Sequence, residues 1–504
     1  MIECLKINES YSLLKGDIVT LRNIMNYLKV EKPGAYFNRR IQLGLEDRYT
    51  YFTKFVNNKD MLIYNGHKAI LNGFGIEADN ERSEYSETEI DSFLKNLKFP
   101  FEPYDYQLRN IRLALSNNKM LFKSCTGSGK SLTISTILEF YRRKGLKGVL
   151  IVPNINLLTQ FKSDIESYGF EELNNQIQLF GNGNHSDFKT CLTITTWQSL
   201  QKEIPNLEKL AFDFIIVDEA HKSSAEILKD IILKSIKTKI KMGFTGTLPE
   251  DQVAKLTLIG LFGKPETIIT SRELIDRGLA TPVKIHALYL DYSYQDKSLF
   301  FDIPKDAYLK QLSFIKEHEA RQRIIINIAM KMRNDNKNTL ILFQHTEHGK
   351  DIFTRIIHEL QPNLKIEESM ITGKNCMDFQ KENKVYFMNG EQSGKIREEQ
   401  RNLMELDNGI ILIANYSVCS TGINIKNLHN LIFASPLKAF TTISQSLGRL
   451  MRKHKNKKES VIVDIVDNFG YRKPSGIFVN QYKHRLSSSY IPEEFEIIET
   501  HLKV

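Results

Sequence analysis

The segment that most constrains the fold is a glycine-rich turn, Ser124-Cys-Thr-Gly-Ser-Gly-Lys-Ser131. It follows the apolar run Met120–Lys123 and precedes the apolar helical stretch Leu132–Phe140. A strand, a loop and a helix in this order are what a phosphate-binding loop requires, because its glycines let backbone N–H groups approach phosphate oxygens and the helix start favours an anion. The sequence therefore predicts a nucleotide site that includes Thr126, Gly127, Ser128, Gly129, Lys130 and Ser131.

Two side chains of this loop have predicted roles in binding ATP and Mg²⁺. Lys130 can reach the β- and γ-phosphates, and the hydroxyl of Ser131 can coordinate Mg²⁺. The strict pattern has glycine at the position of Ser124, so the general motif is met only in part.

A second site element is Ile215-Ile-Val-Asp-Glu-Ala-His221, an apolar run that ends in two adjacent carboxylates. Asp218 is placed to hold Mg²⁺, directly or through water. Glu219 is placed to orient and polarise the attacking water. Together with the phosphate loop, this pair predicts hydrolysis of a nucleoside triphosphate.

Short apolar runs alternate with amphipathic stretches from about residue 100, and the same alternation begins again after Pro282. The first set comprises Met120–Lys123, Gly148–Val152, Leu192–Thr195, Phe214–Val217 and Lys241–Phe244; the second comprises Thr339–Phe343, Val385–Met388, Ile410–Ile413, Leu431–Phe433 and Val461–Ile465. Alternating strands and helices indicate parallel sheets covered on both faces. The expected fold class is α/β, with two tandem parallel-sheet domains at 96–280 and 281–504 after a small α+β domain with its linker at 1–95.

Two segments read as surface features. The acidic stretch from Glu77 to Asp91 looks like a solvated linker that leads into a short helix. Residues Gln361 to Lys384 are polar and without clear periodicity, which indicates a surface insertion in the second unit.

The composition indicates a soluble chain with a possible polyanionic partner. The net charge is +9 with a pI near 9.0, which is compatible with nucleic acid but weak evidence alone. No apolar run approaches the roughly 20 residues that cross a bilayer, and the first residues lack the features of a signal peptide, so a cytoplasmic location without membrane contact is expected. The five cysteines are dispersed and have no zinc-ligand spacing.

The motifs from Tyr104 to about Asp467 resemble those of superfamily 2 helicases of the DEAH-box type, in the family order. Besides the two elements above, the matching stretches are Tyr106-Gln107, Val152-Pro153, Thr195-Thr-Trp-Gln198, Phe244-Thr-Gly-Thr247, Leu342-Phe-Gln-His345, Ser420-Thr-Gly-Ile-Asn424 and Gln445-Ser-Leu-Gly-Arg-Leu-Met-Arg452. Further stretches, His345-Thr-Glu-His-Gly-Lys350 among them, are similar to the helicases that phages use in recombination. This resemblance implies two RecA-like domains that close on ATP, and a host-cytoplasm location if the protein is phage-encoded.

The resemblance also implies roles for single residues. Arg449 and Arg452 would face the γ-phosphate as catalytic cations, and Gln107, Gly422 and Asn424 would contact the nucleotide, although many helicases carry aspartate at the position of Asn424. Residues implied to couple hydrolysis to movement are His221, Thr245, Thr247 and Gln445. Residues implied to contact nucleic acid are Asn154, Thr195, Trp197, Gln198, His345 and Thr421.

Three candidate contacts keep a structural alternative. Trp197 also fits a buried structural residue, and Lys455–Lys458 fits either a solvated turn or a phosphate contact. In the N-terminal region Arg39, Arg40 and Arg48 are interleaved with Tyr36 and Phe37, which suits nucleic acid but equally a half-buried strand with a basic face.

The expected partner is DNA, single-stranded and branched, and RNA stays possible; the chain is expected to be a monomer. The leading hypothesis is ATP-dependent unwinding or remodelling of branched DNA. The alternatives are an RNA helicase, an ATPase that translocates without unwinding, a non-enzymatic annealing protein, and the motor half of a restriction complex.

Overall fold

The chain folds into two compact units, Met1–Ile269 and Thr270–Val504. The computed structural model describes residues 2–504 except 78–80, 126, 182, 184–186, 223–224, 301–306, 374–375, 421–424, 437–447, 449 and 471–474. Each unit contains one seven-stranded parallel sheet, and the first also contains a small antiparallel sheet. The predicted fold class is therefore confirmed. The units divide about ten residues before the boundary expected from the sequence at 280.

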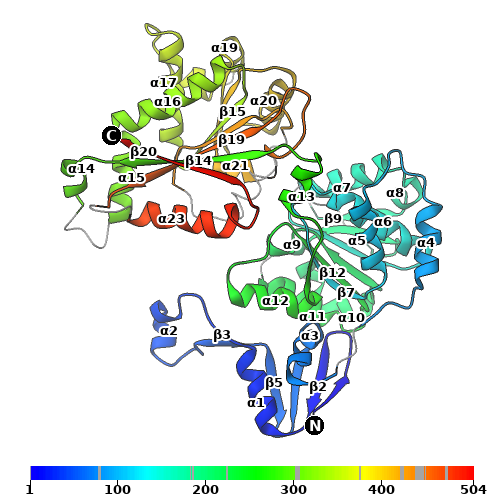
Figure 1. The fold of residues 1–504 in the computed structure, drawn as a ribbon. Helices are drawn as coiled ribbons and strands as arrows, with labels where there is room; N and C mark the ends of the chain where they lie inside the picture. The colour runs from blue at the N-terminus through cyan, green and yellow to red at the C-terminus, as the bar shows by residue number, and fades with distance from the viewer. Residues whose placement is uncertain are drawn as a thin grey trace. The chain divides into compact units, whose positions relative to one another are not determined.

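The parallel sheet of the first unit has the strand order β13-β7-β12-β11-β8-β10-β9 (Figure 1). Its strands are β7 (Lys119–Lys123), β8 (Gly148–Val152), β9 (Ile177–Phe180), β10 (Leu192–Thr196), β11 (Phe214–Val217), β12 (Ile240–Thr245) and β13 (Pro265–Thr267). Strands β8, β10, β11 and β12 are buried along their whole length. Because helices cover both faces of such a sheet, its inner strands are apolar on both sides and appear in the sequence as continuous apolar runs.

The helices of this unit fill the connections between the strands. They are α4 (Glu87–Lys95), α5 (Asp105–Leu115), α6 (Lys130–Arg143), α7 (Asn156–Ser167), α8 (Glu171–Asn174), α9 (Trp197–Leu200), α10 (Leu207–Leu210), α11 (Ala225–Lys234) and α12 (Gln252–Phe262). Helix α4 packs on this domain through Phe93, whose ring meets Phe140 of α6 edge to face at 4.9 Å. It thus belongs structurally to the parallel-sheet domain rather than to the N-terminal sheet.

The small sheet has the order β1-β2-β6-β5 and is antiparallel. Its strands are β1 (Glu3–Lys6), β2 (Tyr11–Lys15), β5 (Thr53–Asn57) and β6 (Asp60–Tyr64). The same domain contains helix α1 (Ile18–Tyr27), capped by the Asp17 side chain, which accepts from the N–H of Thr20. A two-stranded ribbon of β3 (Lys29–Glu31) and β4 (Tyr49–Tyr51) extends from this sheet and carries the short helix α2 (Arg39–Gln42) (Figure 1).

The small sheet packs tightly onto helix α12. A Cβ at Gly66 would lie 2.2 Å from the carbonyl oxygen of Ile259, and one at Gly260 would lie 2.8 Å from the ring of His67. The imidazole of His67 is bonded to the carbonyl of Leu256 at 2.8 Å, and burial lowers the pKa of His67 to about 4. Two backbones that approach this closely leave room only for glycine, so the small sheet is a fixed part of the first unit.

A buried lysine adds a second connection to the small sheet. Lys241, on β12, donates from Nζ to the carbonyls of Glu9 and Ile232 and to Oγ of Ser10, at 3.2, 2.9 and 2.8 Å. Burial lowers the pKa of Lys241 to about 7.

The prediction that the acidic stretch from Glu77 to Asp91 is wholly solvated is wrong for Glu81. Its carboxylate is 9% exposed and forms ion pairs with Lys68 and Lys119. The run of acidic residues concealed one carboxylate that is buried because two cations surround it. The short helix expected after this stretch is confirmed as α4.

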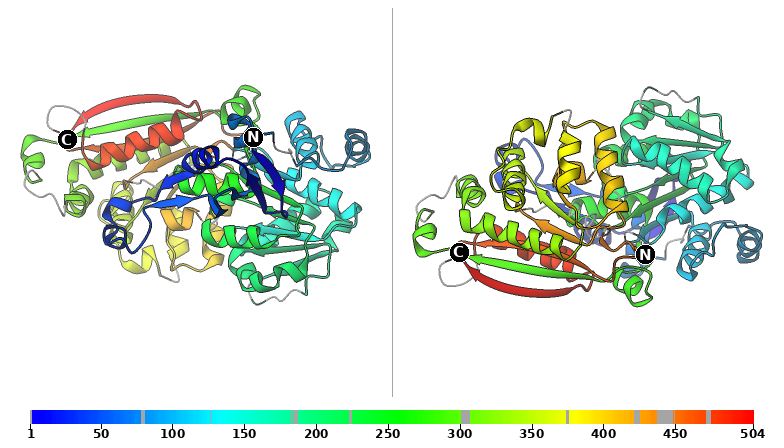
Figure 2. Two further views of the ribbon diagram at one scale, coloured as in Figure 1. Left: turned by 90° about the horizontal axis from the view of Figure 1, so that it is seen from below. Right: turned by 90° about the horizontal axis from the view of Figure 1, so that it is seen from above.

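The second unit has the strand order β16-β17-β15-β18-β19-β14-β20. Its strands are β14 (Val283–Asp291), β15 (Thr339–Phe343), β16 (Val385–Met388), β17 (Ile411–Asn415), β18 (Asn430–Phe433), β19 (Ser460–Asn468) and β20 (Glu496–Lys503). Its helices include α13 (Ser271–Asp276), α14 (Tyr294–Ser298), α15 (Ala307–Glu317), α16 (Glu319–Asn334), α17 (Thr346–Leu360), α18 (Glu368–Ile371), α19 (Cys376–Asn383), α20 (Gly394–Leu406), α21 (Tyr416–Ser420) and α23 (Ile477–Arg485). Strands β14 and β20 run side by side at one edge of the sheet (green and red in Figure 2).

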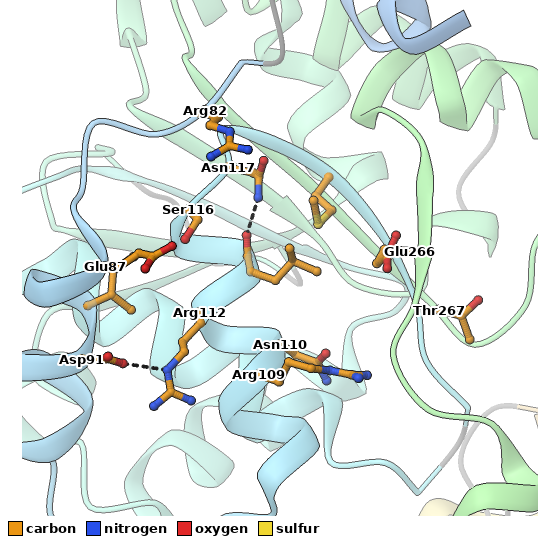
Figure 3. Close-up of a pocket in the computed structure, with 13 residues that line it drawn as sticks. Arg82, Glu87, Asp91, Arg109, Asn110, Arg112, Ser116, Asn117, Glu266 and Thr267 are labelled. Carbon is orange, nitrogen blue, oxygen red and sulfur yellow. Dashed lines mark hydrogen bonds and ion pairs between the residues drawn. The ribbon is translucent and has the colours of Figure 1, made fainter.

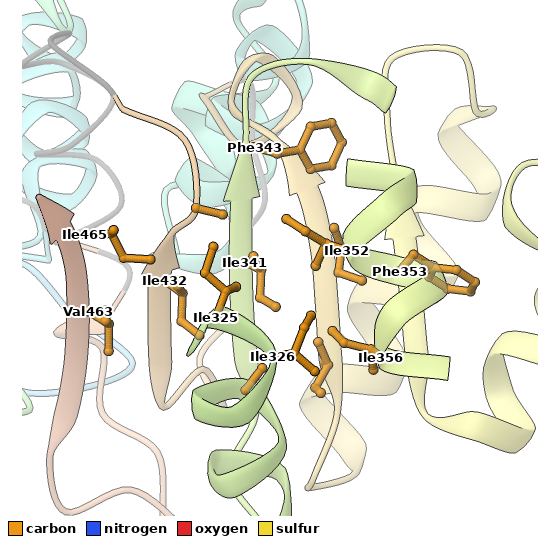
Figure 4. Packing of buried hydrophobic residues seen from close by; sticks show 14 of the residues in the cluster. Ile325, Ile326, Ile341, Phe343, Ile352, Phe353, Ile356, Ile432, Val463 and Ile465 are labelled. Atoms are coloured by element: carbon orange, nitrogen blue, oxygen red, sulfur yellow. The ribbon is translucent and has the colours of Figure 1, made fainter. Parts of the chain in front are cut away.

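The core of the second unit forms where helices α16 and α17 cover the sheet. Ile325 and Ile326 of α16 and Ile352 and Ile356 of α17 are at most 3% exposed and face the apolar side chains of β15, β18 and β19 (Figure 4). The spacing of four residues between Ile352 and Ile356 places both side chains on one face of α17.

The segment Gln361–Lys384 is not a surface insertion, which corrects the prediction. Its helix α19 buries Gln380 completely. The Gln380 amide donates to the carbonyl of Ile371 at 2.8 Å and accepts from the N–H of Phe387 on β16 at 3.2 Å. A buried glutamine with its hydrogen bonds satisfied looks polar in the sequence but is part of the packed structure.

Within the described part of the chain, every helix is too short or too polar to span a lipid bilayer.

Candidate nucleotide-binding site

The candidate nucleotide residues follow three adjacent strands of the first sheet, β7, β12 and β11. The phosphate loop follows β7, Thr245 ends β12, and Asp218 and Glu219 follow β11. Since the three strands are parallel, their carboxyl ends lie at one edge of the sheet, which is where ligands bind in open α/β sheets.

The phosphate loop needs glycine for both backbone conformation and space. Gly127 and Gly129 have φ of 89° and 80°, in the left-handed region that favours glycine. A Cβ at Gly129 would lie 2.2 Å from Nε2 of Gln107. That amide donates to the carbonyl of Ser128 at 3.1 Å, and the hydroxyl of Tyr106 donates to the same oxygen at 2.9 Å. Gln107, predicted from sequence to contact the nucleotide, thus lies directly against the loop.

Ser124, at the position where the strict pattern has glycine, forms hydrogen bonds within the loop and to the strand beside it. Its hydroxyl is hydrogen bonded to the hydroxyl of Ser128, and both side chains are buried. Its backbone N–H donates to the carbonyl of Thr245 at 2.9 Å, which ties the start of the loop to the end of β12. The departure from the strict pattern therefore adds a hydrogen bond within the loop.

Lys130 and Glu219 meet at the centre of the site. Nζ of Lys130 lies 2.9 Å from Oε1 of Glu219 and donates to the carbonyl of Ser124 at 3.3 Å. The other carboxylate oxygen of Glu219 accepts from the N–H of Gly246 at 3.3 Å. Glu219 has φ of 48°, and a residue other than glycine held in the left-handed region stores strain that is characteristic of functional sites.

The pKa values of Glu219 and Asp218 are shifted in opposite directions. Burial opposes ionisation of Glu219, but the positive charges of Lys130 and Lys222 lower its pKa. Burial and the negative charge of Glu219 raise the pKa of Asp218. Although burial works against its charge, Lys130 has a raised pKa because both carboxylates lie close to it. Glu219 is thus ionised and able to accept a proton or a hydrogen bond from water.

A hydrogen-bonded chain leads from Glu219 to the loop after β12. Nδ1 of His221 lies 3.3 Å from Oε2 of Glu219 and 2.6 Å from Oγ1 of Thr245, which in turn donates to the carbonyl of Thr247 at 2.6 Å. Burial lowers the pKa of His221 to about 4, so the ring is neutral. Because Thr245 uses its proton on Thr247, the neutral ring donates from Nδ1. Three of the four residues predicted to couple hydrolysis to movement, His221, Thr245 and Thr247, are therefore joined by hydrogen bonds, and the fourth, Gln445, lies outside the described residues.

Ser131 has a partner that sequence reasoning missed. The side chain of Asp164 on α7 lies close to it: burial raises the pKa of Asp164, and the neighbouring Ser131 hydroxyl opposes that rise. The missed contacts in this site, of Tyr106, Ser124 and Asp164, had little signal in the sequence. Only the position of Tyr106 next to Gln107 pointed to the site.

The candidates for nucleic-acid contact in the first unit follow β8 and β10, next to the nucleotide strands on the same edge. Asn154 is half-buried and accepts from the N–H of Leu157 at the start of α7, and Gln198 is exposed. Thr195 is fully buried and offers no surface to a strand in this conformation. Trp197 is half-buried and packs against the apolar core, as its structural alternative expected.

The remaining candidates lie on separate parts of the chain. His345 is exposed at the start of α17, and Arg452 is half-buried in the second unit. Arg39 and Arg40 are exposed on α2, whereas Arg48 pairs with Glu31 at 2.8 Å. Outside the described residues are Thr126, Thr421, Gly422, Asn424, Gln445 and Arg449.

Comparison with known proteins yields one family match and several long relatives. The family described as type III restriction enzyme, res subunit, matches residues 81–250. The ATP-dependent DNA helicase uvsW of Enterobacteria phage T4 is 27% identical over 481 residues, which cover 92% of this chain and 90% of that protein. Putative helicase 22 of a Sulfolobus islandicus filamentous virus is 26% identical over 481 residues, covering 92% of this chain and 79% of the relative.

A solved structure agrees with the fold. A fragment of a putative HsdR subunit of a type I restriction enzyme from Vibrio vulnificus superposes with a TM-score of 0.55 at 19% identity, over 86% of this chain and 73% of that one. The matched family region contains the phosphate loop, Asp218, Glu219 and the Thr245–Thr247 segment. The site geometry and the sequence relationship therefore fall on the same part of the chain.

Proposed function

Because this chain is homologous to superfamily 2 helicases and carries their ATP-hydrolysing site, we propose that it is an ATP-dependent DNA helicase or translocase that unwinds or remodels branched DNA in recombination, repair or replication. The observation that carries the proposal is the Lys130–Glu219 pair at the carboxyl edge of a parallel sheet, 2.9 Å apart. Exposed Gln198 and half-buried Asn154 follow the neighbouring strands of the same edge, so a nucleic-acid surface adjoins the site.

The residues of the site divide the work of hydrolysis. On phosphate binding, Lys130 exchanges the carboxylate of Glu219 for the β- and γ-phosphates, which frees Glu219 to orient and polarise water. Gln107 and Tyr106 hold the loop in shape through the carbonyl of Ser128. His221 and Thr245 then relay a change at Glu219 to the loop at Thr247, whose backbone carbonyl accepts from the hydroxyl of Thr245.

The oxygen donors of the site fit Mg²⁺. Asp218 supplies a carboxylate and Ser131 a hydroxyl, the hard oxygen ligands that this ion prefers. When bound, the ion would supply positive charge that offsets the negative charge developing on the transferred phosphoryl group. The protein's part is to hold both donors in place, Asp218 after β11 and Ser131 in the first turn of α6.

Glu219→Gln separates binding from chemistry. The amide keeps the size of the side chain but cannot act as a base, so single-turnover hydrolysis should fall by about 10²- to 10⁴-fold. ATP affinity should be retained, since Lys130 and the loop glycines hold the phosphates. Equilibrium ATP binding and single-turnover hydrolysis measure the two effects. A folded variant that loses ATP binding would contradict the role given to Glu219.

The alternatives differ in their response to nucleic acid. An RNA helicase would be stimulated by RNA rather than DNA, and a translocase would hydrolyse ATP without separating strands. An annealing protein would not need Lys130, Asp218 and Glu219, and a restriction motor would depend on a nuclease partner. A panel of forks, four-way junctions, RNA–DNA hybrids and plain duplexes, tested for ATPase stimulation and unwinding, separates them. Failure to unwind or remodel any DNA structure of the panel would overturn the proposal.

We further propose that the N-terminal region contacts duplex DNA near a junction through the arm that carries α2. The tip of this arm exposes Tyr36 by 72% and Phe37 by 84%, next to exposed Arg39 and Arg40. The arm is nevertheless held in shape, because Lys32 pairs with Glu46 at 2.9 Å and Arg48 with Glu31. Aromatic rings beside unpaired arginines suit bases and phosphates.

Arg39→Ala/Arg40→Ala tests this contact by salt titration of fork binding. Binding is described by the slope of the logarithm of the binding constant against the logarithm of the salt concentration, called the log–log salt slope. Each lost phosphate contact should reduce the size of this slope by about 0.9, so the double variant should show a slope smaller by roughly 1.8. Arg22→Ala/Lys54→Ala is the control, because both cations are exposed in the same small domain but away from the arm. Equal slopes for the two double variants would remove the reason for assigning DNA contact to Arg39 and Arg40.

A further inference from the structure

A hollow of about 570 Å³ lies at the start of the second unit, directly after the motif that ends at Arg452. One wall consists of uncharged residues from the end of α13 and the segment after it: Ile275, Gly278, Ala280, Thr281 and Pro282. Its opposite wall is basic and consists of Lys453, His454, Lys455, Lys457 and Lys458.

The charge of this hollow has one sign. None of its lining residues is acidic, and Lys453, Lys455 and Lys458 are exposed without a carboxylate partner in the described parts of the chain. The two acidic residues that adjoin lining residues in the sequence, Asp276 and Glu459, are paired with Arg272 at 3.0 Å and with Lys284 at 3.3 Å. Cations gathered without counter-charges create a positive potential that attracts anions.

A larger hollow in the first unit, of about 680 Å³, shows the contrast (Figure 3). Three arginines line it together with three carboxylates: Arg82, Arg109, Arg112, Glu87, Asp91 and Glu266. Nε of Arg112 bonds Asp91 at 2.7 Å, and Arg109 donates to the carbonyl of Ile268 at 2.7 Å. Its positive and negative side chains are equal in number, whereas the charged side chains that line the hollow of the second unit are all basic.

The basic wall is held rigidly by one of its own lysines. Lys457 is 7% exposed, and its Nζ donates to the carbonyls of Lys426, Leu428 and Leu450 at 3.1, 3.1 and 2.8 Å. All three of its protons are therefore used inside the protein. Lys457 fixes the segment, and its neighbours Lys453, Lys455 and Lys458 are left to face solvent.

Hydrogen bonds also join the two walls. Thr281 donates from its N–H to the carbonyl of Met451 at 2.7 Å and from its hydroxyl to the carbonyl of Arg452 at 3.0 Å. The ring of His454 accepts at Nδ1 from the N–H of Asn456, so the neutral ring carries its proton on Nε2, where it can donate. The hollow is thus a preformed concave surface with several donors and no acceptor side chain of negative charge.

We propose that this hollow binds phosphate groups of a nucleic-acid strand, as a contact separate from the nucleotide site. The inference rests on the proposed function, because it assumes a nucleic-acid partner. Several exposed lysines spread along one wall fit successive phosphates better than one compact ligand. The phosphates of a free nucleotide share this chemistry and are the other source that the test must separate.

The variant Lys453→Gln/Lys455→Gln/Lys458→Gln removes the exposed cations and keeps Lys457, which anchors the wall. On single-stranded DNA the log–log salt slope should fall by about 0.7 per lysine, or roughly 2 in all. The ratio of the variant's Kd to the parent's Kd for single-stranded DNA should therefore increase about 100-fold when the salt concentration is lowered from 1 M to 0.1 M. The control Lys331→Gln/Lys365→Gln/Lys483→Gln removes equal charge from exposed positions of the same unit that do not line the hollow.

Binding of a single-stranded oligonucleotide and of an ATP analogue is measured for parent, variant and control. A lower slope for the variant alone, with unchanged affinity for the analogue, is the expected result. Equal slopes for variant and control would overturn the inference and leave the proposed function standing. Weaker analogue binding with an unchanged DNA slope would assign the hollow to nucleotide phosphates and overturn it as well. A parent that binds no nucleic acid would overturn both. The single variant Lys455→Gln, for which the log–log salt slope should fall by about 0.7, repeats the test with minimal change to folding.

Discussion

Replacing Arg449 with alanine should lower kcat for DNA-stimulated ATP hydrolysis by about 10³- to 10⁵-fold while ATP binding changes far less. A guanidinium that faces the transferring phosphoryl group stabilises charge that develops only in the transition state, so its loss appears in kcat. The loop glycines and Lys130, which we propose bind ATP in the ground state, belong to the first unit, whereas Arg449 belongs to the second. Steady-state hydrolysis at saturating ATP and DNA measures the change in kcat, and equilibrium binding of ATP measures the change in ATP affinity.

Two further variants sharpen this test. Arg449→Lys keeps the charge but loses the forked geometry of the guanidinium, so it should recover only part of the rate. Lys331→Ala, which removes an exposed cation of the same unit, should leave kcat unchanged. A kcat for Arg449→Ala within tenfold of the parent, in a folded protein that still binds DNA, would rule out an arginine finger at this position.

The buried strands of both sheets could be predicted because they are apolar on both faces. The runs Gly148–Val152 and Phe214–Val217 match β8 and β11 residue for residue, and Thr339–Phe343 matches β15. The edge strand β16 (Val385–Met388) was predicted as well, because it is buried along its whole length. The edge strands β13 and β20 were missed for the opposite reason. Strand β20 is mostly exposed along its length, and β13 is short and polar, so neither forms an apolar run.

Within the site, the sequence predicts which residues take part but not how they are held. Motif spacing identified Lys130, Glu219 and Thr245, since phosphate chemistry limits the residue types that can serve there. The contact of Gln107 with Gly129, the hydroxyl pair of Ser124 and Ser128, and the strained backbone of Glu219 depend on tertiary packing. Thr195, a candidate for nucleic-acid contact, is likewise buried, and no local sequence pattern indicates this burial.

The second unit also contains buried charges that its sequence does not reveal. Arg321 on α16 is completely buried and donates to both carboxylate oxygens of Asp467 on β19, at 2.7 and 3.0 Å. It donates in addition to the carbonyl of Ala434 at 2.9 Å, and the hydroxyl of Tyr292 donates to Asp467 at 2.7 Å. One carboxylate thus neutralises the guanidinium and joins the helix to the sheet.

Asp467→Ala should destabilise the second unit by about 3 to 5 kcal/mol, because it leaves the Arg321 guanidinium buried without a counter-charge. Hydrogen exchange of the amides of β19 and α16 reports the loss for this unit separately from the first. The control is Asp407→Ala, which removes a carboxylate that is 52% exposed in its pair with Lys384 and should cost less than about 1 kcal/mol. Arg321→Met/Asp467→Leu removes both charges and should be less destabilised than Asp467→Ala alone. If Asp467→Ala and Asp407→Ala cost the same, the buried pair does not hold α16 to the sheet.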